Sequence, residues 1–411
     1  MKAAIVHYSC PPVIGGVEIV MDIQARFLAR EGFEVTIVAG RGNQTAAISA
    51  AIVPELSSGY PPYAQMEPQL REGLVPDEFF ALKDRIRERL RPLLAGAHSC
   101  IVHNLLTMHL NLAATAALAE LAAEKTSHYL AWTHDATYLD PDCTIPHYGY
   151  PWDILRTPVP GVTYVAISDF RRKNLAKLFG VPPSRITLVP NPVDLPFWLA
   201  LSETGRWLHQ ELRLWDQDLV LFTPTRVSRT KNIDLGIDIL PELKKLVRKV
   251  KLLVTGAPDP HAPEAIAQLE GLRRRARERG VARDVIFLSK MTSPDGAALT
   301  RSREVVRDVY TLADAVFLPS RYEGASLPLL EAGLLRLPAI CSDIEVFQEV
   351  AGKGNALFVS LNERPEVIAR RIVEFVRSIP TARLYRRVLK NAVWETTANR
   401  RLLLRLLAGR R

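Results

Sequence analysis

Short β-branched strands alternate with longer amphipathic helices along most of this sequence. The first such unit predicts a strand over Ala3–Tyr8, a loop that contains Gly15 and Gly16, a helix over Val17–Arg30 and a second strand over Glu34–Ala39. Two consecutive strands joined by a helix pair in parallel, because the helix carries the chain back to the edge where the first strand began. The sequence therefore predicts an α/β fold built on parallel sheets.

The alternation forms two successive arrays separated by the segment Pro190–Pro196, which holds three prolines in seven residues. Clustered prolines favour a linker over a helix or strand. We therefore expect residues 1–190 and 191–380 to form two Rossmann-like, doubly wound domains that face across a cleft. Residues 40–75 contain several prolines and show no clear period, and we expect a long surface excursion there.

Apolar runs bounded by polar residues predict the remaining strands of both arrays. They are Ser99–His103, His128–Thr133, Val162–Ile167 and Ile186–Val189 in the first array, and Leu219–Thr223, Lys251–Thr255, Val285–Leu288, Ala315–Leu318, Pro338–Cys341 and Ala356–Val359 in the second.

Charge and cysteine content exclude several classes of protein. Lys and Arg number 53 against 44 Asp and Glu, which gives a formal net charge of +9. The basic residues gather in runs, which indicates either solvated helix faces or attraction to an anionic partner. No zinc finger or other nucleic-acid module is present, so we expect no nucleic-acid partner. The four cysteines form no C-x-x-C pair, which argues against structural zinc and for a reducing compartment.

The sequence contains no uncharged apolar run of about 18 residues and no signal-peptide pattern at its N-terminus. We therefore expect a cytoplasmic protein. Contact with the inner face of a membrane, through the basic runs, is left open by the sequence.

The most specific motif in the sequence is a pair of glutamates. Glu323 lies in a loop after an expected strand, and Glu331 lies eight residues later inside an expected helix. Ser326 is a good N-cap for that helix, and the N–H groups of Ser326 and Leu327 at its start favour an anion. Carboxylates on either side of an anion site suit a diphosphate flanked by hydroxyls, as in a nucleotide sugar. The plainer alternative is an acidic helix start with an unrelated loop glutamate.

Other polar residues follow strands in the same way. Arg226 and Lys231 come after the first strand of the second array, where two cations can clamp a pyrophosphate. Gly15 and Gly16 allow a ligand to approach the backbone closely, although they do not form the G-x-G-x-x-G pattern of nicotinamide enzymes. His134 follows a strand of the first array and can face a ligand, although single histidines are more often structural.

Together and in this order, the motifs resemble those of the retaining glycosyltransferases of family 4, which have the GT-B fold. The resemblance runs from Met1 to about Phe375. The matching residues are Glu323 and Glu331 for the family's E-x7-E motif, Arg226 and Lys231 for its R-x4-K donor clamp, Gly15 and Gly16 for its N-terminal glycine loop, and His134 for its active-site histidine.

The resemblance implies a role for each of these residues toward a sugar donor. Glu323 would bind hydroxyls of the transferred sugar and Glu331 those of the ribose. Gly16 would lie near the phosphate and the acceptor, and His134 near the outer hydroxyl of the sugar. The groups that would hold the diphosphate are Arg226, Lys231 and the N–H groups of Ser326 and Leu327.

By position, Lys290 or Met291 would contact the nucleobase, although Ser289 stands where the family often has glycine. The family also usually has Asn-Gly-Val-Asp where this chain has Pro192 after Asn191. The resemblance further implies that residues 381–411 form a C-terminal helix that returns to the first domain, with Trp394–Leu407 as the candidate.

The resemblance therefore implies a hexosyltransferase of enzyme class 2.4. It would move a hexose, with glucose or mannose favoured, from a nucleoside-diphosphate sugar to an acceptor hydroxyl with retention of configuration. We expect no cofactor and no metal, because the two cations already occupy the place of a metal. Two alternatives stay open: a nucleotide-sugar 2-epimerase or hydrolase of the same architecture, and a non-catalytic nucleotide-sugar binding protein.

The acceptor is not encoded in these motifs. A small soluble acceptor, including an anionic one such as a glycerate or a sugar phosphate, would use the basic excess of the chain. A polysaccharide or lipid-linked acceptor would use surface on the first domain. We expect the acceptor pocket to involve His103, Asn104, His109 and the segment Tyr138–Trp152.

Overall fold

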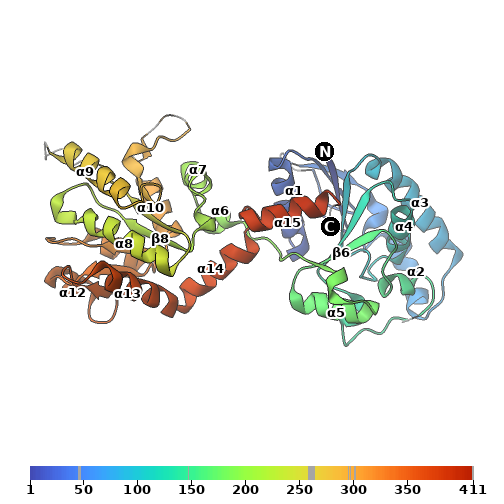
Figure 1. Ribbon diagram of the computed structural model, residues 1–411. Coiled ribbons are helices and arrows are strands. Elements are labelled where there is room, and N and C mark those ends of the chain that lie inside the picture. The colour runs from blue at the N-terminus through green and yellow to red at the C-terminus, as the bar shows by residue number, and fades with distance from the viewer. Residues whose placement is uncertain are drawn as a thin grey trace. The chain divides into compact units, whose positions relative to one another are not determined.

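The computed structural model describes residues 1–44, 48–146, 148–257, 264–294, 296, 298–299 and 302–409. The chain divides into two compact units. Met1–Val193 and Thr397–Arg411 form the first unit, and Asp194–Thr396 forms the second, so the division lies three residues beyond the expected boundary. Each unit contains one parallel sheet flanked by helices (Figure 1), as expected for two Rossmann-like domains.

Seven strands form the sheet of the first unit within the described residues, in the order β3-β2-β1-β4-β5-β6-β7. The chain starts in the middle of the sheet, winds to one edge, returns beside β1 and winds to the other edge. The loops that leave β1 and β4 therefore diverge, which is the place where such sheets bind ligands. The strands are β1 (Lys2–His7), β2 (Glu34–Ala39), β3 (Ser49–Ile52), β4 (Ser99–His103), β5 (His128–Thr133), β6 (Val162–Ala166) and β7 (Thr187–Leu188).

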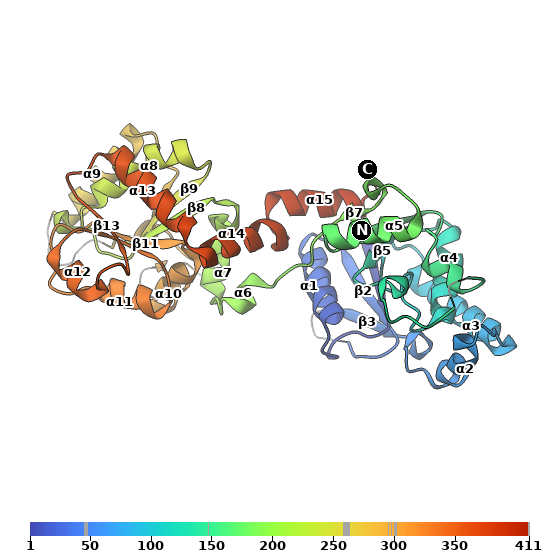
Figure 2. The ribbon, with the colours of Figure 1, turned by 90° about the horizontal axis from the view of Figure 1, so that it is seen from below.

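Helices flank this sheet, as seen from a second direction in Figure 2. Strand β4 is buried at every position, as expected for a parallel strand with both faces covered. The helices of the first unit are α1 (Gly16–Arg30), α2 (Pro61–Arg71), α3 (Asp77–Leu94), α4 (Leu112–Ala123), α5 (Asp169–Phe179) and α15 (Thr397–Leu407).

The expectation of a surface excursion over residues 40–75 is wrong. This segment contains the edge strand β3 and the helix α2. Tyr63, Met66 and Leu70 recur at helical spacing and are buried on one side of α2. The prolines suggested a loop, but a proline is also compatible with the start of a helix. Pro61 lies in the first turn of α2, where the missing N–H breaks no helical hydrogen bond. Residues 45–47 lie outside the described part of the chain.

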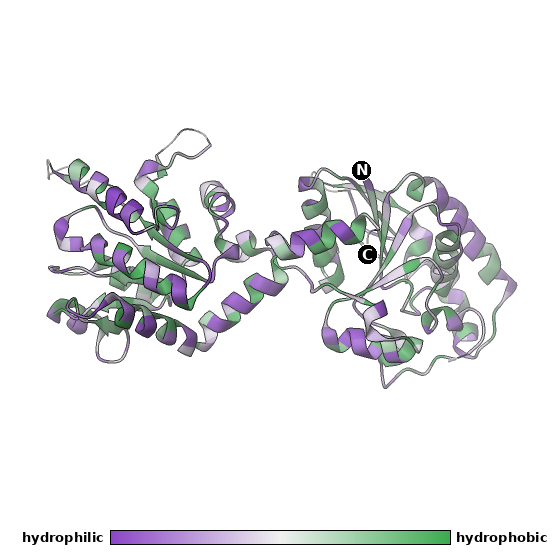
Figure 3. Cartoon of the chain, viewed as in Figure 1, coloured by the Kyte–Doolittle hydropathy of each residue, from purple (hydrophilic) through white to green (hydrophobic). Residues whose placement is uncertain are grey.

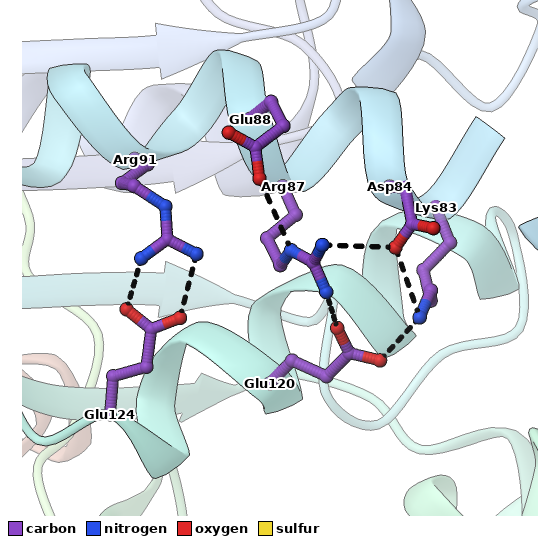
Figure 4. Close-up of polar contacts among 7 residues, drawn as sticks. All are labelled: Lys83, Asp84, Arg87, Glu88, Arg91, Glu120 and Glu124. Carbon is purple, nitrogen blue, oxygen red and sulfur yellow. Dashed lines mark hydrogen bonds and ion pairs between the residues drawn. The ribbon is translucent and has the colours of Figure 1, made fainter. Parts of the chain in front are cut away.

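Helix α3 packs against the Ala-rich helix α4 through apolar residues at helical spacing, among them Phe79, Leu82, Ile86 and Leu90. Charged side chains line the edge of this contact (Figure 4). Glu120 of α4 accepts from Lys83 and from Arg87 of α3, each at 2.5 Å. The guanidinium of Arg91 donates two hydrogen bonds to the carboxylate of Glu124, at 2.6 and 2.9 Å. A carboxylate shared by two cations holds the helices together better than an isolated surface pair does.

We expect Glu120→Ala to lower the thermal midpoint of the first unit by about 2–4 °C, because it removes the two contacts of 2.5 Å that link α3 to α4 and leaves Lys83 and Arg87 only contacts with carboxylates of their own helix, such as those of 3.2 Å with Asp84. Glu88→Ala is the control, since Glu88 is exposed and contacts Arg87 only at 3.5 Å. Thermal unfolding followed by circular dichroism measures both variants. Equal midpoints for the two variants would show that the shared carboxylate contributes nothing to stability.

Six strands form the sheet of the second unit within the described residues, in the order β10-β9-β8-β11-β12-β13. Here the winding direction reverses between β8 and β11. Every residue of β8 is buried. The strands are β8 (Leu219–Thr223), β9 (Val250–Val254), β10 (Val285–Phe287), β11 (Ala315–Leu318), β12 (Ala339–Ser342) and β13 (Leu357–Val359).

The helices of the second unit place their apolar sides on the sheet and their polar sides outward (Figure 3). Ile237 and Leu240 of the second-unit core, for example, are fully buried. The sequence predicts a helix over residues 262–279, and the start of that range lies outside the described residues. The helices are α6 (Leu195–Trp198), α7 (Glu203–Glu211), α8 (Ile233–Leu246), α9 (Ala265–Glu278), α10 (Arg303–Leu312), α11 (Leu327–Leu334), α12 (Glu345–Ala351), α13 (Pro365–Ser378) and α14 (Pro380–Ala392).

Residues 381–411, expected as one helical tail of the first domain, are split between the units. Arg386 of α14 pairs with Asp314 and donates to the carbonyl of Gln217 at 2.6 Å, so α14 belongs to the second unit. In α15, the carbonyl of Leu407 accepts from Ser99 of β4 at 2.6 Å. Figures 1 and 2 both show the end of α15 beside the strands of the first unit.

Candidate functional site

The donor residues expected in the second unit lie along one edge of its sheet. Arg226 is exposed on the loop after β8, and Lys231 closes a 3₁₀ turn just before α8. Glu323 lies on the loop after β11, the strand that pairs with β8. The three residues therefore follow the two strands between which the winding direction reverses, where a ligand is expected.

Lys231 and Glu323 are in direct contact although 92 residues separate them in the sequence. The ammonium of Lys231 donates to Oε1 of Glu323 at 2.5 Å, and the hydroxyl of Ser320 donates to the same oxygen at 2.8 Å. Both side chains are largely buried, with 25% of Lys231 and 12% of Glu323 exposed. Within the described residues no group donates to Oε2 of Glu323, so this oxygen can accept from a ligand hydroxyl.

A second set of bonds fixes the two loops against each other. The backbone N–H of Arg321 donates to the carbonyl of Thr230 at 2.7 Å, and its guanidinium donates to Oδ1 of Asn232 at 2.7 Å. Asn232 adopts the left-handed conformation, with φ at 51°, which asparagine tolerates better than most residues. The loops after β8 and β11 thus present Lys231 and Glu323 in one fixed geometry.

Helix α11 starts as the sequence predicts. The hydroxyl of Ser326 accepts from the backbone N–H of Leu329 at 3.3 Å, and Pro328 occupies the first turn. Leu330 N–H bonds to the carbonyl of Ser326. The N–H of Leu327 has no acceptor among the described residues, and the Leu327 side chain is exposed, so this helix start is open to an anion.

The carboxylate of Glu331 has a partner that the sequence did not reveal. Its Oε2 accepts from the hydroxyl of Tyr310, on α10, at 2.6 Å. Tyr310 is buried and packs edge-on against Phe222 of β8. Burial raises the pKa of the Tyr310 hydroxyl, and the hydrogen bond to Glu331 raises this pKa further, so the tyrosine stays a donor. The position of the Glu331 carboxylate is thus set by the core.

Lys290 and Met291 follow β10, on the same edge of the sheet. Lys290 is exposed and lies 3.9 Å from the carboxylate of Glu270, whereas Met291 is half-buried. Ser289, which stands where the resembling family often has glycine, donates to the carbonyl of Gly256 at 2.7 Å. The serine therefore ties the loop after β10 to the loop after β9.

In the first unit, three histidines lie at the carboxyl ends of neighbouring strands. His7 ends β1, His103 ends β4, and His134 directly follows β5. The rings of His103 and His134 stack with centroids 5.2 Å apart. The backbone N–H of His134 donates to Oδ1 of Asn104 at 2.8 Å, which fixes the loop that carries it. The sequence placed His134 near the sugar of the donor and His103 in the acceptor pocket. It did not predict that the two rings are in contact.

Hydrogen bonds link His134 into a chain that determines its tautomer. Gln24 Oε1 lies 2.8 Å from Nε2 of His103 and can only accept, so this nitrogen carries the hydrogen. Nδ1 of His103 then accepts from Nε2 of His134 at 2.9 Å. Nδ1 of His134 accepts in turn from the amide of Asn191 at 3.4 Å. His134 is therefore a neutral ring with both nitrogens engaged.

The charge state of these rings follows from burial. Burial, followed by repulsion from His7, lowers the pKa of His134 to about 4. The pKa of His103 is well below its usual range, mainly through burial and then through the other two rings. Burial also lowers the pKa of His7, although the carbonyl of His103 and the charge of Glu18 oppose this shift. All three rings are therefore neutral near pH 7. They can form hydrogen bonds, but they contribute no positive charge.

The glycine loop of the first unit begins helix α1. A Cβ at Gly15 would meet the carboxylate of Glu18, whereas a Cβ at Gly16 would meet nothing within 4 Å. Neither residue has positive φ, so internal packing and backbone conformation do not require glycine at position 16. Close approach of a ligand would require it. Glu18 is buried and accepts from Ser9, a contact that sequence reasoning missed.

The basic runs of the second unit are largely neutralised within it. Arg275 and Arg279 of the α9 region share the carboxylate of Asp238, at 2.5 and 3.0 Å. Lys244 pairs with Asp284 at 2.5 Å. These pairs favour the interpretation of the runs as solvated helix faces.

No group of three or more His, Cys, Asp or Glu side chains in the described ranges is placed to hold a metal ion. Within the same residues, no helix has the length and apolar character needed to cross a membrane.

Two family models match the chain, one in each unit. The model described as Glycosyltransferase Family 4 matches residues 14–197, and the model described as Glycosyl transferases group 1 matches residues 207–392. Together they include the glycine loop, His134, the Lys231–Glu323 pair and Glu331.

Individual proteins also resemble the chain. It is 24% identical to mannosylglucosylglycerate synthase of Thermotoga maritima over 386 residues, which cover 89% of this chain and 86% of that protein. It is 27% identical to D-inositol 3-phosphate glycosyltransferase of Jonesia denitrificans over 212 residues, 50% of this chain and 46% of that one. Sucrose-phosphate synthase from Thermosynechococcus elongatus aligns over 99% of both chains at 17% identity, with a TM-score of 0.39.

Proposed function

We propose that this chain, which belongs to the glycosyltransferase families of group 1 and family 4, transfers a hexose from a nucleoside-diphosphate sugar to an acceptor hydroxyl with retention of configuration. The observation that carries the proposal is the contact of Lys231 with Glu323 at 2.5 Å, beside the open start of α11. A cation, a carboxylate and a helix start together suit a sugar bound to a diphosphate.

On the donor side, Arg226, Lys231 and the N–H of Leu327 bind the diphosphate and stabilise the charge that develops as it leaves. Oε2 of Glu323 accepts from a hydroxyl of the transferred hexose, while Oε1 keeps Lys231 in place. Glu331, fixed by Tyr310, accepts from the ribose. Lys290 and Met291 lie on the same sheet edge and contact the nucleobase.

In the first unit, Gly16 lets a phosphate or an acceptor approach the start of α1. His134 acts as a neutral hydrogen-bonding group toward the hexose. Because its pKa lies near 4, it is too weak a base to deprotonate an acceptor at neutral pH. The leaving phosphate therefore accepts the proton of the incoming hydroxyl, on the same face of the sugar, which leads to retention.

We propose that the cations make a metal unnecessary, and that the hexose is glucose or mannose. The name of the Thermotoga maritima relative refers to both mannosyl and glucosyl groups, which supports this choice of sugar for the chain.

A product assay tests this function. The purified chain is incubated with UDP-, GDP- and ADP-hexoses, with and without a panel of hydroxyl acceptors, in buffer with EDTA. We expect release of nucleoside diphosphate together with an acceptor glycoside whose anomeric configuration, read by NMR, matches the donor. Conversion of the donor without acceptor would instead indicate an epimerase or hydrolase, and binding without any product would indicate a sensor.

A further inference from the structure

A cavity of about 470 Å³ opens in the first unit, beside the carboxyl ends of β4 and β5. This volume lies within the range of small-molecule sites, about 300–1,000 Å³. Its wall includes Met108 and His109 from the loop after β4, and Thr137 from the loop after β5. None of the donor residues Arg226, Lys231, Glu323 and Glu331 lines it.

Five charged side chains line the cavity, and acidic ones are in excess. Two arginines, Arg71 and Arg171, stand against three aspartates, Asp135, Asp140 and Asp142. Burial, and then the charge of Arg71, lowers the pKa of His109, so this ring adds no positive charge near neutral pH. The chain as a whole has a net positive charge, but the cavity is lined by more acidic than basic side chains.

Both arginines already have carboxylate partners. Arg171 donates to Asp135 at 2.6 Å, and Arg71 donates to Glu67 at 2.8 Å. An anion that entered the cavity would have to compete with these pairs for either guanidinium.

Asp140 and Asp142 are exposed at the rim, and no cation lies within ion-pair distance of either one among the described residues. One oxygen of Asp140 accepts from the backbone N–H of Asp142 at 3.0 Å. The remaining carboxylate oxygens of both residues can accept hydrogen bonds from a ligand in the cavity. Carboxylates that face a cavity without a cation suit neutral donors, and vicinal hydroxyls supply such donors in pairs.

We propose that this cavity binds a hydroxyl-rich group without negative charge, such as a neutral sugar unit, and that this group belongs to the acceptor. The second half of the proposal rests on the proposed function. Asp140 and Asp142 accept from the hydroxyls, and Nε2 of His109, a ring whose Nδ1 lies 2.9 Å from the hydroxyl of Thr137, bonds to the ligand. A carboxylate or phosphate on the acceptor would face two like charges, which selects against glycerate or sugar-phosphate groups at this position.

Binding without donor tests the cavity. The probes are methyl α-D-glucopyranoside, methyl α-D-mannopyranoside, D-glycerate and glucose 6-phosphate, added to the full chain and followed by saturation-transfer NMR. We expect at least one neutral glycoside to bind, and its Kd to rise at least tenfold in the Asp140→Asn/Asp142→Asn double variant. Neither anion should displace it. Glu78→Gln, which removes a charge at an exposed position of α3 in the same unit, is the control and should leave Kd unchanged.

The possible outcomes distinguish a failure of the cavity proposal from a failure of the proposed function. Stronger binding of an anion than of the neutral glycosides, no binding of any glycoside, or equal Kd in the double variant and the parent would overturn the proposal. Donor affinity, measured in parallel, should be the same in both proteins. If neutral glycosides bind as expected but no donor is bound or converted, the cavity is still a sugar site and the proposed function fails instead.

Discussion

Replacing Glu323 with alanine is expected to lower kcat at least about a hundredfold while the chain stays folded. The variant removes the acceptor for a hexose hydroxyl and also releases Lys231, whose ammonium is held by Oε1 of Glu323 at 2.5 Å. Loss of one preorganised group at a developing charge typically costs about 3–4 kcal/mol of barrier, enough for this effect. Steady-state kinetics with saturating donor and acceptor measure it, and circular dichroism checks the fold.

Lys231→Ala is expected to reduce kcat to a similar extent, and the double variant little further, because the two side chains act as one unit. Lys245 and Glu242 provide a matched control: they form an ion pair of 2.7 Å on α8 in the same unit, away from the sheet edge. Alanine at either control position should leave kcat within about twofold. Near-normal turnover of a folded Glu323→Ala variant would refute the assignment of the donor site.

Apart from the edge strand β3, which lies in the segment expected as a surface excursion, the strands could be predicted well, because each is a short apolar run that polar residues bound on both sides. Leu219–Thr223 and Ala315–Leu318 have the predicted limits, and both are buried on both faces of their sheet. Helix α2 was missed because its prolines resemble a loop signal. Helix α3 carries so many charges that its apolar stripe is inconspicuous, although Phe79, Leu82 and Ile86 follow helical spacing.

The site could be predicted only as separate pieces. Motif spacing places Arg226, Lys231 and Glu323 at strand ends, because polar residues that follow a buried strand reach the sheet edge. Which strand ends are neighbours depends on strand order, and the pairing of β8 with β11 cannot be read from either segment alone. For the same reason the contact of Tyr310 with Glu331 was not foreseen, since the tyrosine lies on a different helix.

The histidine chain was missed for a related reason, although a signal was available. His7, His103 and His134 each end or directly follow a strand, and β1, β4 and β5 are consecutive in the sheet. A histidine at three neighbouring strand ends indicates a cluster once the strand order is known. Gln24 and Asn191, which complete the chain of hydrogen bonds, carry no such signal, because Gln24 lies within an expected helix and Asn191 within the expected linker, and neither follows a strand of the cluster.

The buried histidines make the stability of the first unit depend on pH. The pKa of His134 is lowered from 6.5 to about 4 in the folded chain. Between these values the unfolded chain binds a proton that the folded chain does not, so the free energy of unfolding falls as pH falls from about 6.5 to about 4. A shift of this size corresponds to a loss of about 3 kcal/mol, which is complete below pH 4. His209 of the second unit, whose pKa burial lowers to about 3, has an effect of the same sign.

We therefore expect His134→Gln to flatten the dependence of unfolding free energy on pH between about 6.5 and 4, because glutamine keeps a hydrogen-bonding group but takes up no proton. Urea unfolding at several pH values measures this, with fluorescence that includes the buried Trp132, which lies beside His103 in the first unit. His98→Gln is the control, since that ring is exposed in the folded unit, and it should keep the parent slope. If His134→Gln retained the parent slope as well, the ring would take up its proton at the same pH in the folded and the unfolded chain, and the lowered pKa assigned to His134 would be wrong.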